Sequence, residues 1–181
     1  MKNILILIIV LLLTSCKTSK NASLEISKNT FTKTVNCPDN GECSIELIPN
    51  KSLEFKMDEF GNSYPIISEG EKTILKYTYT KKVDKSVQDS FYTEIVYAEF
   101  DKTISEISLI DGELQNVKFY FGRLCYCKGE TGYYAIKNGD FKISELQKNS
   151  LKIDFEFSIK EVPQIISKIS ETVSLKSNAT N

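Results

Sequence analysis

Five cysteines are the residues of this chain best suited to chemistry, because a thiolate is a nucleophile, a redox group and a ligand for soft metals. Cys16 follows an apolar run, Cys37 and Cys43 lie close together, and Cys125 and Cys127 flank one tyrosine. Arg123, the only arginine, precedes Cys125 by two residues and would favour a nearby thiolate. The Cys125-Tyr126-Cys127 motif therefore supports two hypotheses beside a structural disulfide: a thiol-redox site and a copper-handling site.

The other catalytic residue types give no comparable pattern. The chain has no histidine, which excludes Ser-His-Asp and Cys-His nucleophiles and histidine-based zinc sites. Carboxylates are scattered over predicted strands and turns, so no acid/base pair can be read from their spacing; they include Glu94, Glu99, Asp101 and Glu106. We therefore predict no catalytic residue, no metal site and no cofactor, and favour a protein that is not an enzyme.

Tyrosines cluster around glycines in the same part of the sequence as the Cys-Tyr-Cys motif. Tyr126, Tyr133 and Tyr134 are candidates for a binding surface, since aromatic rings can form a platform for a sugar, a peptide or a lipid. The alternative is structural, because tyrosine is common in half-buried strands and at hairpin edges.

The N-terminal segment has the form of an export signal. Lys2 supplies a charge, residues 4–13 form ten continuous apolar residues, and Leu13-Thr14-Ser15-Cys16 follows. Ten apolar residues suit a signal peptide, whereas a spanning helix needs roughly 20. The segment resembles the signal peptide and lipobox of bacterial lipoprotein precursors.

That resemblance implies cleavage before Cys16, a diacylglycerol on its thiol and further acylation, palmitate included, of the new amino terminus. Two or three acyl chains hold a protein firmly on a membrane. The expected location is the cell envelope. Lys17 rather than Asp after the cysteine favours the outer membrane facing the periplasm, with surface exposure as an alternative.

Lipidation of Cys16 would leave four cysteines in an oxidising compartment, which favours two disulfides. Alternation predicts that Cys43, Cys125 and Cys127 point toward the core. Alternate residues of an extended strand lie about 6.5 to 7 Å apart at Cα, at or beyond the upper limit for a disulfide. We therefore expect crossed bridges between the two cysteine pairs, while local Cys37–Cys43 and Cys125–Cys127 bridges remain the alternative.

Length and composition predict one domain behind the signal. Residues 1–15 are expected to be cleaved, residues 16–29 to form the lipidated cysteine and a flexible tether, residues 30–176 a single β-rich domain, and residues 177–181 a disordered tail. The chain carries 23 basic and 24 acidic side chains, which gives no basic surface for nucleic acid.

The domain shows strand periodicity rather than helical periodicity. Leu151, Ile153, Phe155, Phe157 and Ile159 alternate with polar residues, and residues 91–100 carry apolar groups on both faces, as a central strand does. Residues 81–89 are predicted to form a longer loop. Turns are predicted at residues 39–41, 60–62, 69–70, 111–112, 128–129 and 138–140.

About ten such strands predict an all-β, mainly antiparallel domain, since one flat sheet would leave an apolar face in water. We favour a β-sandwich over a β-barrel. Helical spacing of Val162, Ile165, Ile166 and Ile169, with Pro163 in the first turn, suggests a short C-terminal helix, although a strand fits Val173 and Leu175 equally well.

Together these patterns favour a membrane-anchored envelope lipoprotein with a non-catalytic binding or structural role. Its expected partners are the membrane, through the lipid anchor, and an envelope protein, a glycan or a lipid. The alternatives are a thiol-redox or copper-handling protein that uses Cys125 and Cys127, and a lipid-carrying barrel.

Overall fold

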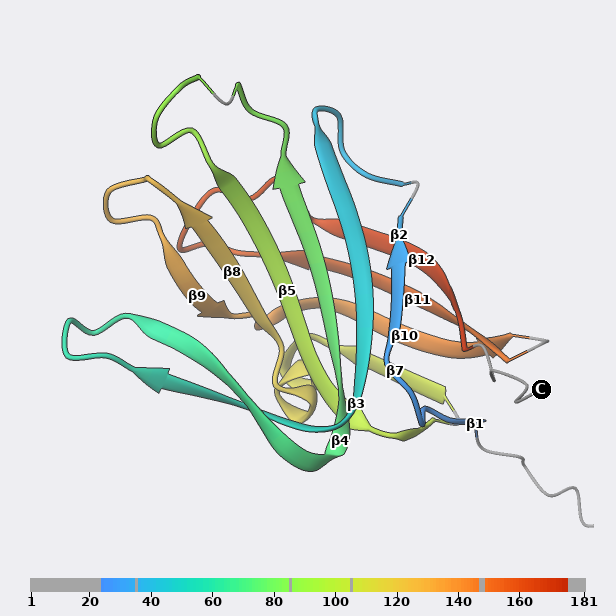
Figure 1. The fold of residues 1–181 in the computed structure, drawn as a ribbon. Coiled ribbons are helices and arrows are strands. Elements are labelled where there is room, and N and C mark those ends of the chain that lie inside the picture. The colour runs from blue at the N-terminus through green and yellow to red at the C-terminus, as the bar shows by residue number, and fades with distance from the viewer. Residues whose placement is uncertain (1–23, 35, 85, 105, 147–148, 176–181) are drawn as a thin grey trace, which may run out of the picture.

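The computed structural model describes residues 24–175, apart from residues 35, 85, 105 and 147–148. The described chain forms two antiparallel sheets packed face to face (Figure 1). The predicted signal peptide, Cys16 and the predicted tail lie outside the described residues. Within the described part of the chain, no helix has the length and apolar character needed to cross a membrane.

The larger sheet has six strands in the order β2-β3-β4-β5-β8-β9. Their bounds are Thr30–Lys33 for β2, Gly41–Met57 for β3, Ser63–Lys81 for β4, Tyr92–Asp101 for β5, Tyr120–Cys125 for β8 and Gly132–Ala135 for β9.

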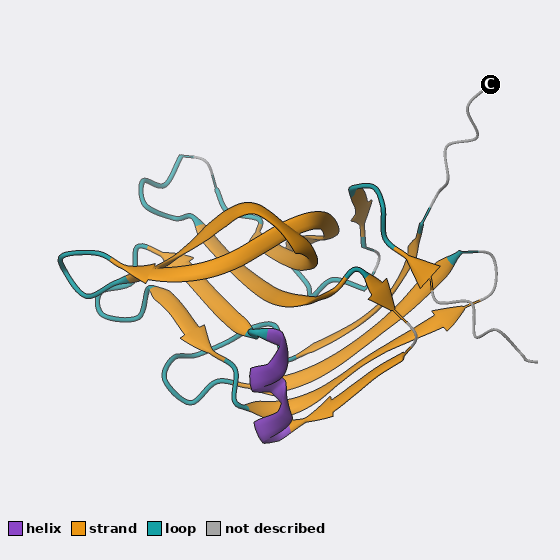
Figure 2. Cartoon of the chain, turned by 90° about the horizontal axis from the view of Figure 1, so that it is seen from below, coloured by secondary structure: helices purple, strands orange, loops and turns teal. Residues whose placement is uncertain are grey.

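The smaller sheet has four strands in the order β12-β11-β10-β7. Their bounds are Lys168–Ser174 for β12, Ser150–Ser158 for β11, Asn138–Leu146 for β10 and Glu106–Ile110 for β7. A short pair, β1 (Leu24–Glu25) and β6 (Thr103–Ile104), adds a third sheet, and the 3-10 helix η1 (Asp111–Val117) lies at one end of the sandwich (Figure 2).

The predicted all-β, antiparallel fold is confirmed, and the sandwich is confirmed over the barrel. Among the described residues each sheet ends in two edge strands, β2 and β9 in one and β12 and β7 in the other, so neither sheet closes on itself. Residues 24–26, which belong to the segment expected as a tether, are part of the fold: β1 pairs with β6, and Ile26 is buried.

The core between the sheets is built from alternate residues of each strand. Phe119 stacks on Phe155 with ring centroids 4.4 Å apart, and Phe141 meets both rings edge-on. Phe141 and Phe155 are cross-strand partners on β10 and β11. The predicted inward orientation of Cys43 on β3 is confirmed. Ile45 and Leu47 on β3 are buried as well, and so are Leu75, Tyr77 and Tyr79 on β4.

The β3–β4 hairpin bends away from the larger sheet halfway along its length. The pairing of β3 with β4 shifts between Pro49 and Lys51, and Asn50 has a left-handed φ of 56°. A bulge of this kind bends a strand pair. Residues 51–57 and 63–69, which we call the hairpin arm, therefore leave the line of the sheet (Figure 1).

Three of the six predicted turns are confirmed, at residues 39–40, 59–61 and 128–130. The loop predicted at residues 81–89 lies at residues 82–91, where it joins β4 to β5. The other three are wrong: Gly70 lies inside β4, residues 138–140 open β10, and residues 111–112 start η1. Gly70 is needed within β4 because a Cβ there would lie 2.8 Å from the backbone nitrogen of Ser52 at the bend.

The predicted C-terminal helix is wrong. Residues 159–167 form an irregular loop that we call the capping loop, and β12 follows it. Val162, Ile166 and Ile169 are buried as their spacing suggested, but on a loop and a strand. The loop keeps its shape because Gln164 accepts a hydrogen bond from the Ile159 N–H at 2.5 Å and its amide donates to the Ile166 carbonyl at 2.8 Å.

Candidate functional site

The three tyrosines predicted as a binding surface do not lie together. Tyr133 pairs with Gly122 and faces outward from the larger sheet, whereas Tyr134 pairs with Phe121 and packs toward the core. Tyr126 lies in the β8–β9 turn and is 76% exposed. Tyr133 and Tyr134 are consecutive residues of β9, so their side chains point to opposite faces of the sheet.

Tyr133 belongs to a second apolar core between the larger sheet and the hairpin arm. Phe55 of the arm stacks on Tyr120 at a centroid distance of 3.7 Å and lies 5.5 Å from Tyr133 and 6.3 Å from Tyr97. Leu53, Ile74 and Ile95 complete the cluster. Burial raises the pKa of Tyr97 and of Tyr133. These rings pack against one another and bury apolar surface. Tyr133 is therefore a packing residue of this second core.

A buried carboxylate, Glu99 on β5, holds the arm in place. It accepts the Leu53 N–H at 2.5 Å and the Ser52 hydroxyl at 3.3 Å, and forms an ion pair with Lys118 at 2.7 Å. Lys118 also donates to the Leu53 carbonyl at 3.0 Å. Glu99 and Lys118 therefore satisfy the backbone N–H and the carbonyl of Leu53, a fully buried residue of the arm.

The tip of the arm is a hydrogen-bonded turn that presents apolar side chains to solvent. The Asp58 carboxylate accepts the backbone N–H groups of Phe60 and Asn62 at 2.9 and 2.7 Å, and these bonds, the one from Asn62 foremost, lower its pKa. Phe60 is 81% exposed and Met57 is 71% exposed. These hydrogen bonds hold the backbone of the turn from which Phe60 projects, and Met57 is the last residue of β3 before it.

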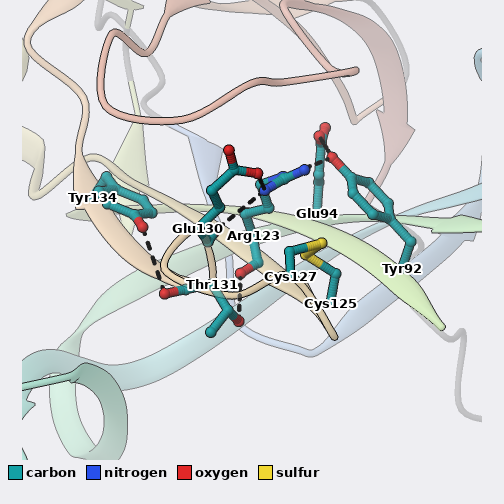
Figure 3. The surroundings of a disulfide bond; sticks show 8 residues. All are labelled: Tyr92, Glu94, Arg123, Cys125, Cys127, Glu130, Thr131 and Tyr134. Atoms are coloured by element: carbon teal, nitrogen blue, oxygen red, sulfur yellow. Dashed lines mark hydrogen bonds and ion pairs between the residues drawn. A yellow bond between two sulfur atoms is a disulfide. The ribbon is translucent and has the colours of Figure 1, made fainter. Parts of the chain in front are cut away.

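On the inner face of the sheet, Arg123 joins the β8–β9 turn to β5 (Figure 3). Its Nη1 donates to the Glu130 carboxylate at 2.6 Å and its Nε to the Tyr92 hydroxyl at 3.2 Å. The Tyr92 hydroxyl donates to Glu94 at 2.5 Å, and burial together with Glu94 raises the pKa of Tyr92 to about 12.

Glu94 carries this network into the capping loop. Its carboxylate accepts the backbone N–H groups of Ile165 and Ile166, both at 2.7 Å. Glu94 and Glu99, the two buried carboxylates of β5, face opposite sides of the sheet. Glu94 binds the backbone of the capping loop, and Glu99 binds the backbone of the arm. Neither is arranged beside a second carboxylate for acid/base chemistry.

A third buried carboxylate, Glu171 on β12, is not fully hydrogen-bonded. Its Oε1 has no hydrogen-bond partner among the described residues, and the hydroxyls of Thr34 and Tyr77 are likewise unpaired there. Burial raises the pKa of Glu171 and raises that of Tyr77 to about 12. This carboxylate is a cost to the fold at neutral pH.

The cysteines form two local pairs, Cys37–Cys43 and Cys125–Cys127, with Cα separations of 5.5 and 5.2 Å. The expected crossed bridges are wrong. The expectation assumed that the strand continues through Cys127, but β8 ends at Cys125 and the chain then turns, which brings the two Cα atoms within reach. Cys43 and Cys125 point inward as predicted, whereas Cys127 is half-buried.

Among the described residues, no group of three or more cysteine, aspartate or glutamate side chains could hold a metal ion. No family model, curated protein or solved structure matches this chain. The features of this region that the sequence did not suggest are the arm tip and the Glu99 and Glu94 contacts, because all of them depend on how distant segments pack.

Proposed function

We propose that this chain is a lipid-anchored envelope protein whose β-sandwich has a binding role without catalysis, and that it docks on a partner protein through the tip of the hairpin arm. The observation that carries the binding role is the hydrogen-bonded turn at which Phe60 and Met57 are exposed.

The N-terminal segment supports the anchor. Leu13-Thr14-Ser15-Cys16 has the pattern of a lipobox, and Cys16 precedes the first described residue, Leu24, by eight positions. Eight residues span at most about 30 Å when fully extended. A domain tethered at Cys16 would remain near the lipid surface, in our proposal the outer membrane facing the periplasm.

Use of the buried carboxylates supports binding over catalysis. Glu94 and Glu99 hold backbone N–H groups of the capping loop and of the arm. A general acid or base needs a carboxyl that reaches substrate, and these two carboxyls are committed to the fold.

The charges around the arm tip indicate the kind of partner. Lys56, Asp58 and Glu59 surround Met57 and Phe60 with both signs of charge. A polyanion or an anionic lipid surface would meet repulsion from the two acids. An apolar cleft on another envelope protein, with polar groups at its rim, fits an apolar tip ringed by mixed charges.

Lipidation is tested by feeding cells an alkyne-tagged palmitate and measuring label and detergent-phase partitioning. We expect both for the wild-type chain and for Ser15→Ala, and loss of both for Cys16→Ser. A labelled Cys16→Ser variant, or a mature N-terminal peptide that begins at Met1, would contradict the anchor.

The arm is tested by placing a photo-activated crosslinking residue at position 60 in intact cells. We expect one discrete protein adduct whose yield falls when Met57 is changed to serine. The same residue at position 110 is the control, since Ile110 is 55% exposed on the smaller sheet. Equal adducts from both positions, adducts between copies of this chain, or adducts with lipid alone would contradict the proposed partner.

A further inference from the structure

The two disulfides of this chain have different structural roles. Cys37–Cys43 closes a loop with a sequence separation of 6 and has one fully buried member, Cys43. Cys125–Cys127 has a separation of 2 and connects residues that the chain already holds side by side. Because the stabilisation from a disulfide grows with the loop it closes, the second bridge contributes the lesser amount.

The β8–β9 turn is held by other contacts besides its disulfide. The Glu130 N–H donates to the Cys127 carbonyl at 3.1 Å, the Thr131 hydroxyl donates to the Arg123 carbonyl at 3.1 Å, and Arg123 is paired with Glu130. Opening the bridge would leave these contacts intact. The fold can therefore tolerate the reduced state of this cysteine pair.

The two sulfur-bearing residues differ in access to solvent. Cys125 is 7% exposed, whereas Cys127 is half-buried on a turn whose next three residues are exposed. The bridge borders a pocket of about 430 Å³ lined by Cys125, Tyr126, Cys127, Lys128, Gly129 and Thr131. An incoming thiolate would reach Cys127 first, with the exposed Tyr126 ring beside it.

The inner residue of the pair lies close to a fixed positive charge. Arg123 precedes Cys125 by two residues on the same face of β8, and Tyr92, over whose ring the Arg123 guanidinium lies at 5.3 Å, is the cross-strand partner of Cys125 (Figure 3). A cation near a leaving sulfur stabilises the thiolate that forms. Glu130 neutralises part of that charge through its ion pair with Arg123.

We propose that Cys125 and Cys127 form a thiol–disulfide exchange site that oxidises a pair of thiols in another polypeptide. The partner thiolate attacks Cys127 Sγ, the Cys125–Cys127 bond breaks, and Cys125 leaves as a thiolate. A second thiolate of the partner then attacks the partner sulfur that is bonded to Cys127 in the mixed disulfide. Cys127 is released as a thiolate. The partner gains a disulfide and loses two electrons, and its two protons end on Cys125 and Cys127.

The test uses the full chain in detergent, with Cys16→Ser so that no other thiol is present, and a reduced peptide that contains two cysteines. We expect one peptide disulfide to form for each Cys125–Cys127 pair reduced, with Cys37–Cys43 intact and the far-ultraviolet spectrum unchanged. In glutathione mixtures Cys125–Cys127 should open at least about tenfold faster than Cys37–Cys43.

Trapping the mixed disulfide tests the direction of attack. When the oxidised Cys125–Cys127 pair reacts with reduced glutathione and the reaction is quenched with acid, glutathione should be found on Cys127 in about tenfold excess over Cys125. Equal amounts on the two cysteines, equal resistance of the two bridges, or loss of the fold on reduction would overturn the proposal.

Charge variants separate a chemical role from a structural one. Arg123→Gln should slow opening of the bridge, and Glu130→Gln should accelerate it, because the first removes the cation and the second removes its neutralising partner. Lys142→Gln, on the smaller sheet, removes one positive charge far from the bridge and is the control. The same sign of change for Arg123→Gln and Glu130→Gln would also overturn the proposal. This inference is independent of the arm, since the assay contains no arm partner.

Discussion

Replacement of Glu99 by alanine should release the hairpin arm while leaving the rest of the sandwich folded. The variant loses the acceptor for the Leu53 N–H, and an unpaired buried backbone group costs about 1 to 3 kcal/mol. The Lys118 ion pair adds less, about 0 to 1 kcal/mol, since the Lys118 side chain is 47% exposed. We therefore expect the arm to lose about 2 to 3 kcal/mol of local stability.

Hydrogen exchange followed by mass spectrometry measures this loss peptide by peptide. A change of about 2 to 3 kcal/mol corresponds to roughly 30- to 150-fold faster exchange in residues 51–57 and 63–69, while β10 and β11 keep their protection. Asp101→Ala is the matched control: it removes a carboxylate from the same strand, but one that is 75% exposed and paired with Lys72. If Glu99→Ala changes exchange in the arm no more than Asp101→Ala does, the reasoning is refuted.

Three further predictions concern other contacts. Gly122→Ala should cost about 1 to 3 kcal/mol in urea unfolding, because its Cβ would lie 2.4 Å from the Tyr133 ring; a cost no larger in wild-type than in a Tyr133→Ala background would contradict this. Glu94→Gln should accelerate exchange of the Ile165 and Ile166 amides and proteolysis of the capping loop; unchanged cleavage would count against the contact. Because burial raises the folded-state pKa of Glu171, its contribution to stability is present below the ordinary glutamate value of 4.5 and lost as the pH rises through the folded value. Glu171→Gln should therefore be more stable than wild-type at pH 7 in thermal unfolding, with a gain that shrinks toward pH 4; a gain independent of pH would contradict the assignment.

Local alternation was sufficient to predict the sandwich. Leu151, Ile153, Phe155 and Phe157 all face the core from β11, and β5 is buried on both faces as its apolar residues of both parities indicated. Burial of one face of a strand is a property of its own sequence, since a period of two is enough to form that face. The class of fold follows from summing such strands.

Features that depend on where a strand ends or bends were not predictable in the same way. Cys127 fits the inward parity of Phe119 and Phe121, yet β8 stops at Cys125 and a turn brings the two cysteines together. Val162, Ile166 and Ile169 have helical spacing, yet the Glu94 carboxylate, more than seventy residues earlier, binds the backbone of that segment in an irregular form. A strand end decided the first outcome, and a partner distant in the sequence decided the second.

The hairpin arm shows why the same pattern can produce both a core and an exposed apolar surface, which we propose as the binding surface. Leu53, Phe55 and Met57 alternate on one face of β3, and nothing in their spacing distinguishes them. Leu53 lies beside the bend and is fully buried, Phe55 is half-buried on Tyr120, and Met57 is 71% exposed where the arm extends past its cover. The exposure of each side chain on this face of β3 depends on how far the arm extends beyond β8 and β9. An apolar residue placed beyond the last covering ring remains available to a partner, and Met57 and Phe60 occupy that position because the β3–β4 hairpin is longer than the strands it packs against.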